Sequence, residues 1–229
     1  PAAPWFPPPI ARVVEGGCAS TLAFEFSDGP ARIIVNCGGA RAAVAALPKS
    51  LVQGLRTTAA HSTLTLADTN STAVHPDGTL GRGVAEVEVT RQESENASRI
   101  EASHDGYVRR HGFVHRRQLI LTADGRELRG EDVLLPQGRR RRPGAAAFAI
   151  RFHLGQGVEA SPTADGLGAV LRVPGGPMWQ FRTRGDSLAI EESLWIDGEG
   201  RPIATQQLVI GGAAEAGGAT VGWALKRAR

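Results

Sequence analysis

The chain has 229 residues, a formal net charge of +3 and a hydrophobic content of 41%. This length fits one large strand-rich domain or two small ones, and it is enough to bury a core without stabilising disulfides. The small net charge excludes a strongly basic chain built for nucleic acid, and the absence of any run of about 20 apolar residues argues against a membrane span.

The first ten residues, PAAPWFPPPI, include five prolines. Such a composition is typical of an extended linker. The sequence starts without Met and shows no signal peptide. We therefore expect a piece of a longer protein, with residues 1–12 as a linker and residues 13–229 as the folded domain.

The chain from residue 18 onward has the pattern of β-strands. Thr21–Ser27 alternates between apolar and polar residues, Asp28-Gly29 marks a turn, and Ile33–Cys37 returns. Asp-Gly between two such runs predicts a β-hairpin. A short helix or an irregular loop is expected at Ala42–Arg56.

Further strands follow, each bounded by Gly, Pro or Asp. Val84–Thr90 sets valines opposite glutamates, which predicts a half-buried strand. A second hairpin is expected around Asp124-Gly125. The other expected strands are Ser62–Ala67, Phe113–Thr122, Glu127–Leu135, Ala146–Leu154, Ala169–Val173, Met178–Thr183, Leu188–Ile196, Ile203–Ile210 and Thr220–Leu225. About a dozen strands without a long helix predict an all-β fold, a large two-sheet antiparallel β-sandwich.

Arginine provides almost all of the basic charge, because Lys49 and Lys226 are the only lysines among 26 basic residues. Arginine pairs bidentately with carboxylate, sulfate or phosphate, so an acidic ligand is one explanation. The arginine codons of a GC-rich genome are the other. The run Arg139–Arg142 lacks interleaved aromatic residues and a nucleic-acid-reading motif, so a nucleic-acid partner is not expected.

The two cysteines, Cys18 and Cys37, do not form a metal-type Cys-x-x-Cys pair. They fit either one disulfide or two buried thiols in a reducing compartment, and we favour the thiols.

Three of the six histidines fall in the stretch ASHDGYVRRHGFVHRRQLIL, residues 102–121. In a helix, His111 and His115 would have the spacing of a zinc-binding pair. Gly112 interrupts that helix, however, and the residues that follow it favour a strand. We therefore interpret the stretch as a strand that His104 and Tyr107 enter through a turn.

A strand here puts His115 and Arg117 on one face with Phe113, Leu119 and Leu121. Burying a histidine and an arginine on an apolar face is costly unless both are paired. They therefore have internal hydrogen-bonding partners or form the floor of a groove.

The remaining histidines differ in context. His61 stands at the start of a strand, where a side chain can project from a rigid edge. His153 alternates with apolar neighbours and is expected in the core. His75 precedes Pro-Asp-Gly and is expected in a solvated turn.

Several separated motifs then occur in a characteristic order. They are LAFEFSDG to RIIVNCGG (residues 22–39), TTAAHSTLTLADTNST (57–72), SHDGYVRRHGFVHRRQLILTADGRELRGEDVL (103–134), AIRFHL (149–154), WQFR (179–182) and EESLW (191–195). Together they resemble the C-terminal domain of heparinase II/III-like proteins. The resemblance implies a β-sandwich preceded by an α/α toroid of helices in the same protein.

The resemblance further implies polysaccharide lyase chemistry on a uronic-acid polymer, such as a heparin-, heparan- or alginate-like chain. In this family the sandwich lends a histidine across the cleft, and His61 holds that position, in His-Ser-Thr where many relatives have His-Asn-Thr. The other catalytic groups come from the toroid, so this chain alone is expected to be inactive. A periplasmic location is expected, with a cytoplasmic one as the alternative.

By the same resemblance, His104, His115 and Arg117 are candidates for binding an acidic polysaccharide or oligosaccharide. Some relatives carry a metal near the position of His104, so zinc or calcium is a candidate ligand there. Thr63 stands where one such relative has a second histidine. Tyr107 belongs to a turn motif and is expected to be structural. The alternative function is a non-catalytic carbohydrate-binding or structural module.

Overall fold

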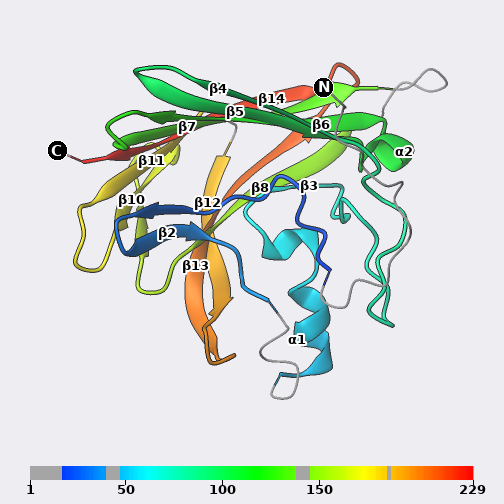
Figure 1. Ribbon diagram of the computed structural model, residues 1–229, viewed down its shortest axis with the longest axis horizontal. Coiled ribbons are helices and arrows are strands. Elements are labelled where there is room, and N and C mark those ends of the chain that lie inside the picture. Colours follow the sequence, from blue (N-terminus) through cyan, green and yellow to red (C-terminus); the bar gives the residue numbers. More distant parts are fainter. Residues whose placement is uncertain (1–16, 40–46, 138–144, 185–186, 229) are drawn as a thin grey trace, which may run out of the picture.

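A computed structural model describes residues 17–39, 47–137, 145–184 and 187–228. The predicted linker at residues 1–12 and the run Arg139–Arg142 lie outside these ranges. The described residues form two antiparallel sheets that enclose a common core (Figure 1). The predicted all-β two-sheet sandwich is thereby confirmed.

The smaller sheet has the strand order β1-β2-β8-β13-β12, with β3 paired to β8 off this path. Its strands are β1 (Phe26–Asp28), β2 (Ala31–Val35), β3 (Leu64–Leu66), β8 (Ala146–Leu154), β12 (Ser187–Ile196) and β13 (Pro202–Ala214). The predicted turn at Asp28-Gly29 joins β1 to β2. Gly29 has a φ of 57°, which glycine adopts without steric cost.

The larger sheet has the order β4-β5-β6-β7-β14-β11-β10-β9. Its strands are β4 (Val87–Glu93), β5 (Ala97–His104), β6 (Phe113–Thr122), β7 (Glu127–Pro136), β9 (Glu159–Pro162), β10 (Gly168–Arg172), β11 (Trp179–Thr183) and β14 (Ala219–Arg227). Asp124-Gly125 connects β6 to β7 as predicted, and it sets a register in which Arg117 lies opposite Asp132.

The helical segments that the structure describes are short. They are α1 (Lys49–Gly54), the 3₁₀ turn η1 (Thr58–Ala60) and α2 (Val108–His111). Helix α1 lies within the segment where a helix was expected, whereas α2 falls in a stretch expected to be strand. It is a single turn that ends at His111 and is capped by Gly112, whose φ is 77°. No helix within the described ranges is long and apolar enough to cross a membrane.

Strands β5 and β9 were not predicted, and β4 differs from its prediction. Instead of being half-buried, Val87 and Val89 are 51% and 62% exposed. The reason is position, because β4 is an edge strand that pairs with β5 in the described structure. Alternating apolar and polar residues indicate a strand, but they do not show whether another part of the protein packs on its apolar face.

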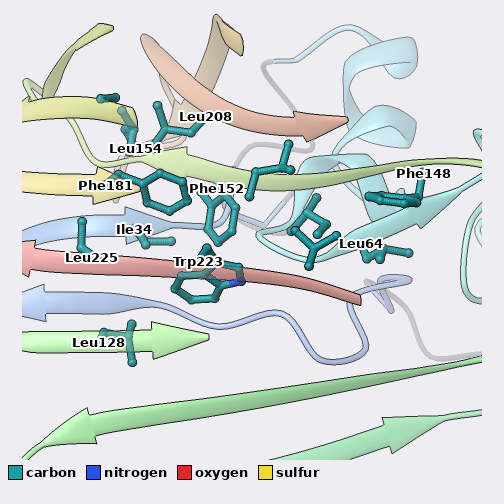
Figure 2. Close-up of a cluster of buried hydrophobic side chains, with 14 of the residues drawn as sticks. Ile34, Leu64, Leu128, Phe148, Phe152, Leu154, Phe181, Leu208, Trp223 and Leu225 are labelled. Atoms are coloured by element: carbon teal, nitrogen blue, oxygen red, sulfur yellow. The ribbon is translucent and has the colours of Figure 1, made fainter. Parts of the chain in front are cut away.

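Aromatic rings pack between the sheets, and Figure 2 shows those of Trp223, Phe152 and Phe181 close together. Trp223 stacks on Phe24 with ring centroids 5.6 Å apart and meets Phe152 edge-on at 4.8 Å. Phe181 completes the cluster, 4.9 Å from Phe152. Aromatic pairs of this kind contribute about 0.5–1.5 kcal/mol each beyond the burial of their apolar area.

Candidate functional site

His61 lies where η1 gives way to β3. Its backbone is extended, with φ −129° and ψ 149°, and the residue is 7% exposed. The imidazole Nδ1 is 2.8 Å from the carbonyl oxygen of Thr57. Because a carbonyl oxygen only accepts hydrogen bonds, Nδ1 carries the hydrogen and Nε2 keeps its lone pair.

The protonation state of His61 follows from its surroundings. Burial lowers the pKa of the imidazole, and the Thr57 carbonyl opposes this effect only in part. The ring is therefore neutral at pH 7. Within the described ranges no protein group hydrogen-bonds to Nε2. A neutral imidazole with a fixed tautomer and a free nitrogen can accept a proton from a ligand.

The backbone around His61, here called the His61 segment (residues 57–63), is held by several parts of the smaller sheet. The Ser62 amide donates to Asn36 Oδ1 at 2.9 Å, and its hydroxyl donates to the Val35 carbonyl at 2.6 Å. The same hydroxyl accepts from the His153 amide at 2.9 Å. These bonds fix the peptide that directly follows the candidate catalytic histidine.

His153 packs beneath the His61 segment as the predicted core histidine, with 2% of its surface exposed. Its Nε2 donates to the Ala59 carbonyl at 3.0 Å, so Nδ1 accepts from the Ser193 hydroxyl at 2.8 Å. Cys37 Sγ lies 3.4 Å from the same Nδ1. Burial lowers the pKa of His153 to about 4, so this histidine is neutral at pH 7.

A second group of polar side chains is buried between the sheets, around Asp132. Its Oδ1 accepts from His115 Nε2 at 2.7 Å and from Arg117 Nε at 2.8 Å. Its Oδ2 accepts from Arg117 Nη2 at 3.1 Å and from Trp223 Nε1 at 3.0 Å. Burial alone would raise the pKa of Asp132, but Arg117 and His115 hold it well below its usual range.

His104 extends this group toward β5. The Gly106 amide donates to His104 Nδ1 at 3.1 Å, so Nε2 carries the hydrogen and points to His115 Nδ1, 3.3 Å away. Burial, followed by the nearby His115 and Arg117, lowers the pKa of His104 to about 3. Burial also lowers the pKa of His115, although Asp132 opposes this effect. Both histidines are therefore neutral at pH 7, and the negative charge of Asp132 is balanced by Arg117.

Arg117 connects this charged group to the His61 segment. Its Nη1 donates to the Ser62 carbonyl at 2.7 Å and to the Leu22 carbonyl at 3.0 Å. Thus three of the predicted site residues lie together, and Arg117 reaches the residue after His61. A charged side chain thus joins the larger sheet to the His61 segment.

The structure gives the predicted substrate-binding residues internal partners. His104, His115 and Arg117 are 2%, 0% and 2% exposed. A sugar-binding role needs side chains that a ligand can reach, whereas Asp132, backbone groups and the neighbouring histidine already engage these three side chains. Contact between them and a sugar stays a prediction. Of the two alternatives given for His115 and Arg117, internal hydrogen-bonding partners or the floor of a groove, the structure shows the first.

The predicted metal ligand His104 is also engaged within the protein. Its Nδ1 accepts from a backbone amide and its Nε2 faces His115. Across the described ranges, no group of three or more His, Cys, Asp or Glu side chains is arranged to hold a metal ion. The residues at this position therefore do not fit the zinc or calcium site that the resemblance implied.

Asp132 was missed in the sequence, although a signal for it exists. It is the seventh residue after Gly125, and Arg117 is the seventh residue before Asp124, so a hairpin centred on Asp124-Gly125 sets them opposite each other. Tyr107 has the structural role that was expected, since its buried hydroxyl donates to the Leu64 carbonyl at 2.8 Å. No disulfide joins Cys18 to Cys37, and of the two expected buried thiols Cys37 is buried whereas Cys18 is only partly buried.

Residues 6–224 match the protein family described as "Heparinase II/III-like, C-terminal". A curated relative is the FtsZ-localized protein C of Caulobacter vibrioides (strain NA1000 / CB15N), which is 31% identical over 215 residues. That alignment covers 83% of this chain and 34% of the relative. The chain thus spans about a third of the length of this protein.

Among solved structures, the heparan sulfate lyase HepC of Pedobacter heparinus is similar, with a TM-score of 0.72 and 14% identity. A heparinase III also gives a TM-score of 0.72, with 13% identity. Each comparison covers 92% of this chain and 30% of the other. At such identities the likeness shows the fold, in agreement with the two-sheet sandwich.

Proposed function

The chain belongs to the heparinase II/III-like C-terminal family, and on that basis we propose that it is the sandwich domain of a polysaccharide lyase. The polymer contains uronic acid, as in heparin-, heparan- or alginate-like chains, and is cleaved by β-elimination. The domain supplies His61 to one wall of the cleft. An α/α toroid in the same protein supplies the other wall and the remaining catalytic groups.

Elimination at a uronate makes defined demands on a protein. A base removes the proton on the carbon next to the carboxylate, a carbon–carbon double bond forms, and the bond to the glycosidic oxygen breaks. The departing oxygen takes up a proton. A neutral imidazole whose pKa is lowered by burial suits the first step, because it is unprotonated at pH 7.

The observation that carries this proposal is the fixed tautomer of His61. Nδ1–H is bound to the Thr57 carbonyl at 2.8 Å, and Nε2 has no protein partner in the described residues. His153, by contrast, has a hydrogen-bonding partner at each ring nitrogen. Family membership supports the reaction class, and the motif around His61 supports its role.

The direct test is to incubate the full-length protein with a panel of uronic-acid polymers and to follow the ultraviolet absorbance of unsaturated uronate products. We expect absorbance to rise with at least one polymer and the rise to be lost in His61→Ala. A full-length protein that is folded but inert on heparin, heparan sulfate, alginate and pectin-type polymers would contradict the proposal.

A second candidate is a non-catalytic module that helps to place a larger protein in the cell. The supporting observation is the relative at 31% identity whose name describes localisation with FtsZ. In that case the described surface would bind a partner without turnover. A fluorescent fusion that keeps its cellular position in His61→Ala, together with an inert full-length protein, would favour this candidate.

A further inference from the structure

Ser62, the residue directly after His61, is held from both sheets at once. Val35 of β2 and His153 of β8 bond its hydroxyl from the smaller sheet. Arg117 of β6 bonds its carbonyl from the larger sheet, with Nη1 2.7 Å from the oxygen. Arg117 therefore anchors the Ser62–Thr63 peptide, and Asn36 holds the His61–Ser62 peptide through the Ser62 amide, so the path of the backbone just after His61 depends in part on where the Arg117 guanidinium is held.

The Arg117 guanidinium has little freedom. Asp132 grips it bidentately, through Nε at 2.8 Å and Nη2 at 3.1 Å, and such a fork fixes the plane of the group. The ring of Phe24 lies against it, 5.4 Å from the guanidinium carbon to the ring centroid. Its remaining nitrogen, Nη1, then points at two backbone carbonyls, those of Ser62 and Leu22.

Asp132 is itself fixed by donors on the other side. His115 Nε2 and Trp223 Nε1 donate to its two oxygens at 2.7 and 3.0 Å. The direction of the His115 bond is set in turn by His104, whose Nε2–H faces His115 Nδ1. The carboxylate has four hydrogen bonds, and each comes from a donor whose position is determined by a β-strand.

Stability alone does not explain a buried pair of this kind. Taking two charges out of water is costly, and replacing a buried ion pair by apolar residues of similar volume often leaves stability unchanged or increases it. A large apolar core already surrounds the pair. Apolar residues could not provide a directed donor for the carbonyl of Ser62, the residue that follows His61.

We propose that Arg117 and Asp132 are positioning residues that hold the His61 imidazole in its working orientation through the Ser62 carbonyl. A role of these residues in catalysis rests on the proposed function. Their effect on the orientation of the His61 ring does not depend on any substrate. Substituting the pair should leave the sandwich folded and release the His61 ring from Thr57.

The test uses nitrogen-15 NMR of the histidine side chains, with signals assigned through His61→Gln. The key variant is the double replacement Arg117→Met/Asp132→Leu, which keeps apolar volume and leaves no unpaired charge. We expect the Nδ1–H tautomer signal of His61 to be lost or broadened, while the signals of His153 stay in place. Leu128→Ala is the matched control, because it removes core contacts of β7 without touching this group.

A milder variant covers the case in which the double replacement does not fold. Trp223→Phe removes a single donor to Asp132 and should shift the His61 signal in the same direction by a smaller amount. An unchanged His61 tautomer in a folded double variant would overturn the inference, and so would an unchanged signal in Trp223→Phe if the double variant is unfolded.

Turnover provides a second readout that separates this inference from the proposed function. If the full-length protein is a lyase, the double variant should lower kcat by about tenfold to a hundredfold with KM nearly unchanged, as expected for a misplaced catalytic group. An inert native protein would reject the lyase assignment while the NMR result still decides the positioning role.

Discussion

The indole ring of Trp223 lies directly over Gly130 of the neighbouring strand, in the space that any side chain at position 130 would occupy. The same indole donates its N–H to Asp132 and stacks within the aromatic cluster (Figure 2). One side chain thus belongs to both the apolar core and the charged group. Packing on β7 and β14 is therefore coupled to the geometry near His61.

The first prediction concerns this contact. Gly130→Ala should lower the free energy of unfolding by about 1–3 kcal/mol, because an added methyl group forces the indole out of a packed position. Urea denaturation followed by tryptophan fluorescence measures the change. Gly54→Ala is the control, since Gly54 lies in α1 with open space around its Cα, and it should be neutral or slightly stabilising.

The second prediction concerns the buried charge. Asp132→Asn should destabilise the protein by about 3–5 kcal/mol, because Arg117 would stay charged in the core without a counter-ion. The exposed pair of Arg91 and Glu93 is the comparison, and Glu93→Gln should leave the urea midpoint unchanged. Equal effects of the two substitutions would mean that the Asp132 carboxylate is not desolvated as the structure shows.

The third prediction concerns acid stability. Burial lowers the pKa of His104 to about 3 and that of His153 to about 4, from 6.5. The folded state therefore binds protons less readily than the unfolded chain, so this stability is fully present above pH 6.5 and is lost as the pH falls toward 4. Each histidine should contribute a slope of about 1.4 kcal/mol per pH unit.

Urea denaturation at a series of pH values between 7 and about 4.5 tests this slope. His153→Gln should reduce the slope by about 1.4 kcal/mol per pH unit, because one of the buried imidazoles with a lowered pKa, those of His61, His104, His115 and His153, is gone. His75→Gln is the matched control, since His75 is exposed in a turn. A slope that is the same in all three proteins would show that these histidines do not control acid stability.

Much of the fold could be predicted from local patterns. The Asp-Gly turns at residues 28–29 and 124–125 predict two hairpins, and alternation predicts most strands because one face of each is buried. Strand β5 was missed because its sequence, ASRIEASH, has few β-branched or aromatic residues. Its place in the sheet comes from pairing with β4 and β6, which local propensity does not report.

The candidate site was predicted in part. The strand pattern puts His115 and Arg117 on the core face, and the structure agrees, but the pattern does not say what pairs with them. Asp132 and Trp223 come from two other strands, so their meeting depends on the register of β7 and β14. The link from Arg117 to the Ser62 carbonyl joins residues 55 positions apart, and only the packed sheets reveal it.

The central claim is that His61 exchanges a proton with a uronate polymer. The most direct measurement is the rate of unsaturated-product formation by the full-length protein, compared between native, His61→Ala and His75→Ala proteins of equal urea midpoint. We predict that His61→Ala lowers kcat by about a hundredfold or more, while His75→Ala retains the native rate. Native turnover in a folded His61→Ala protein would contradict the claim.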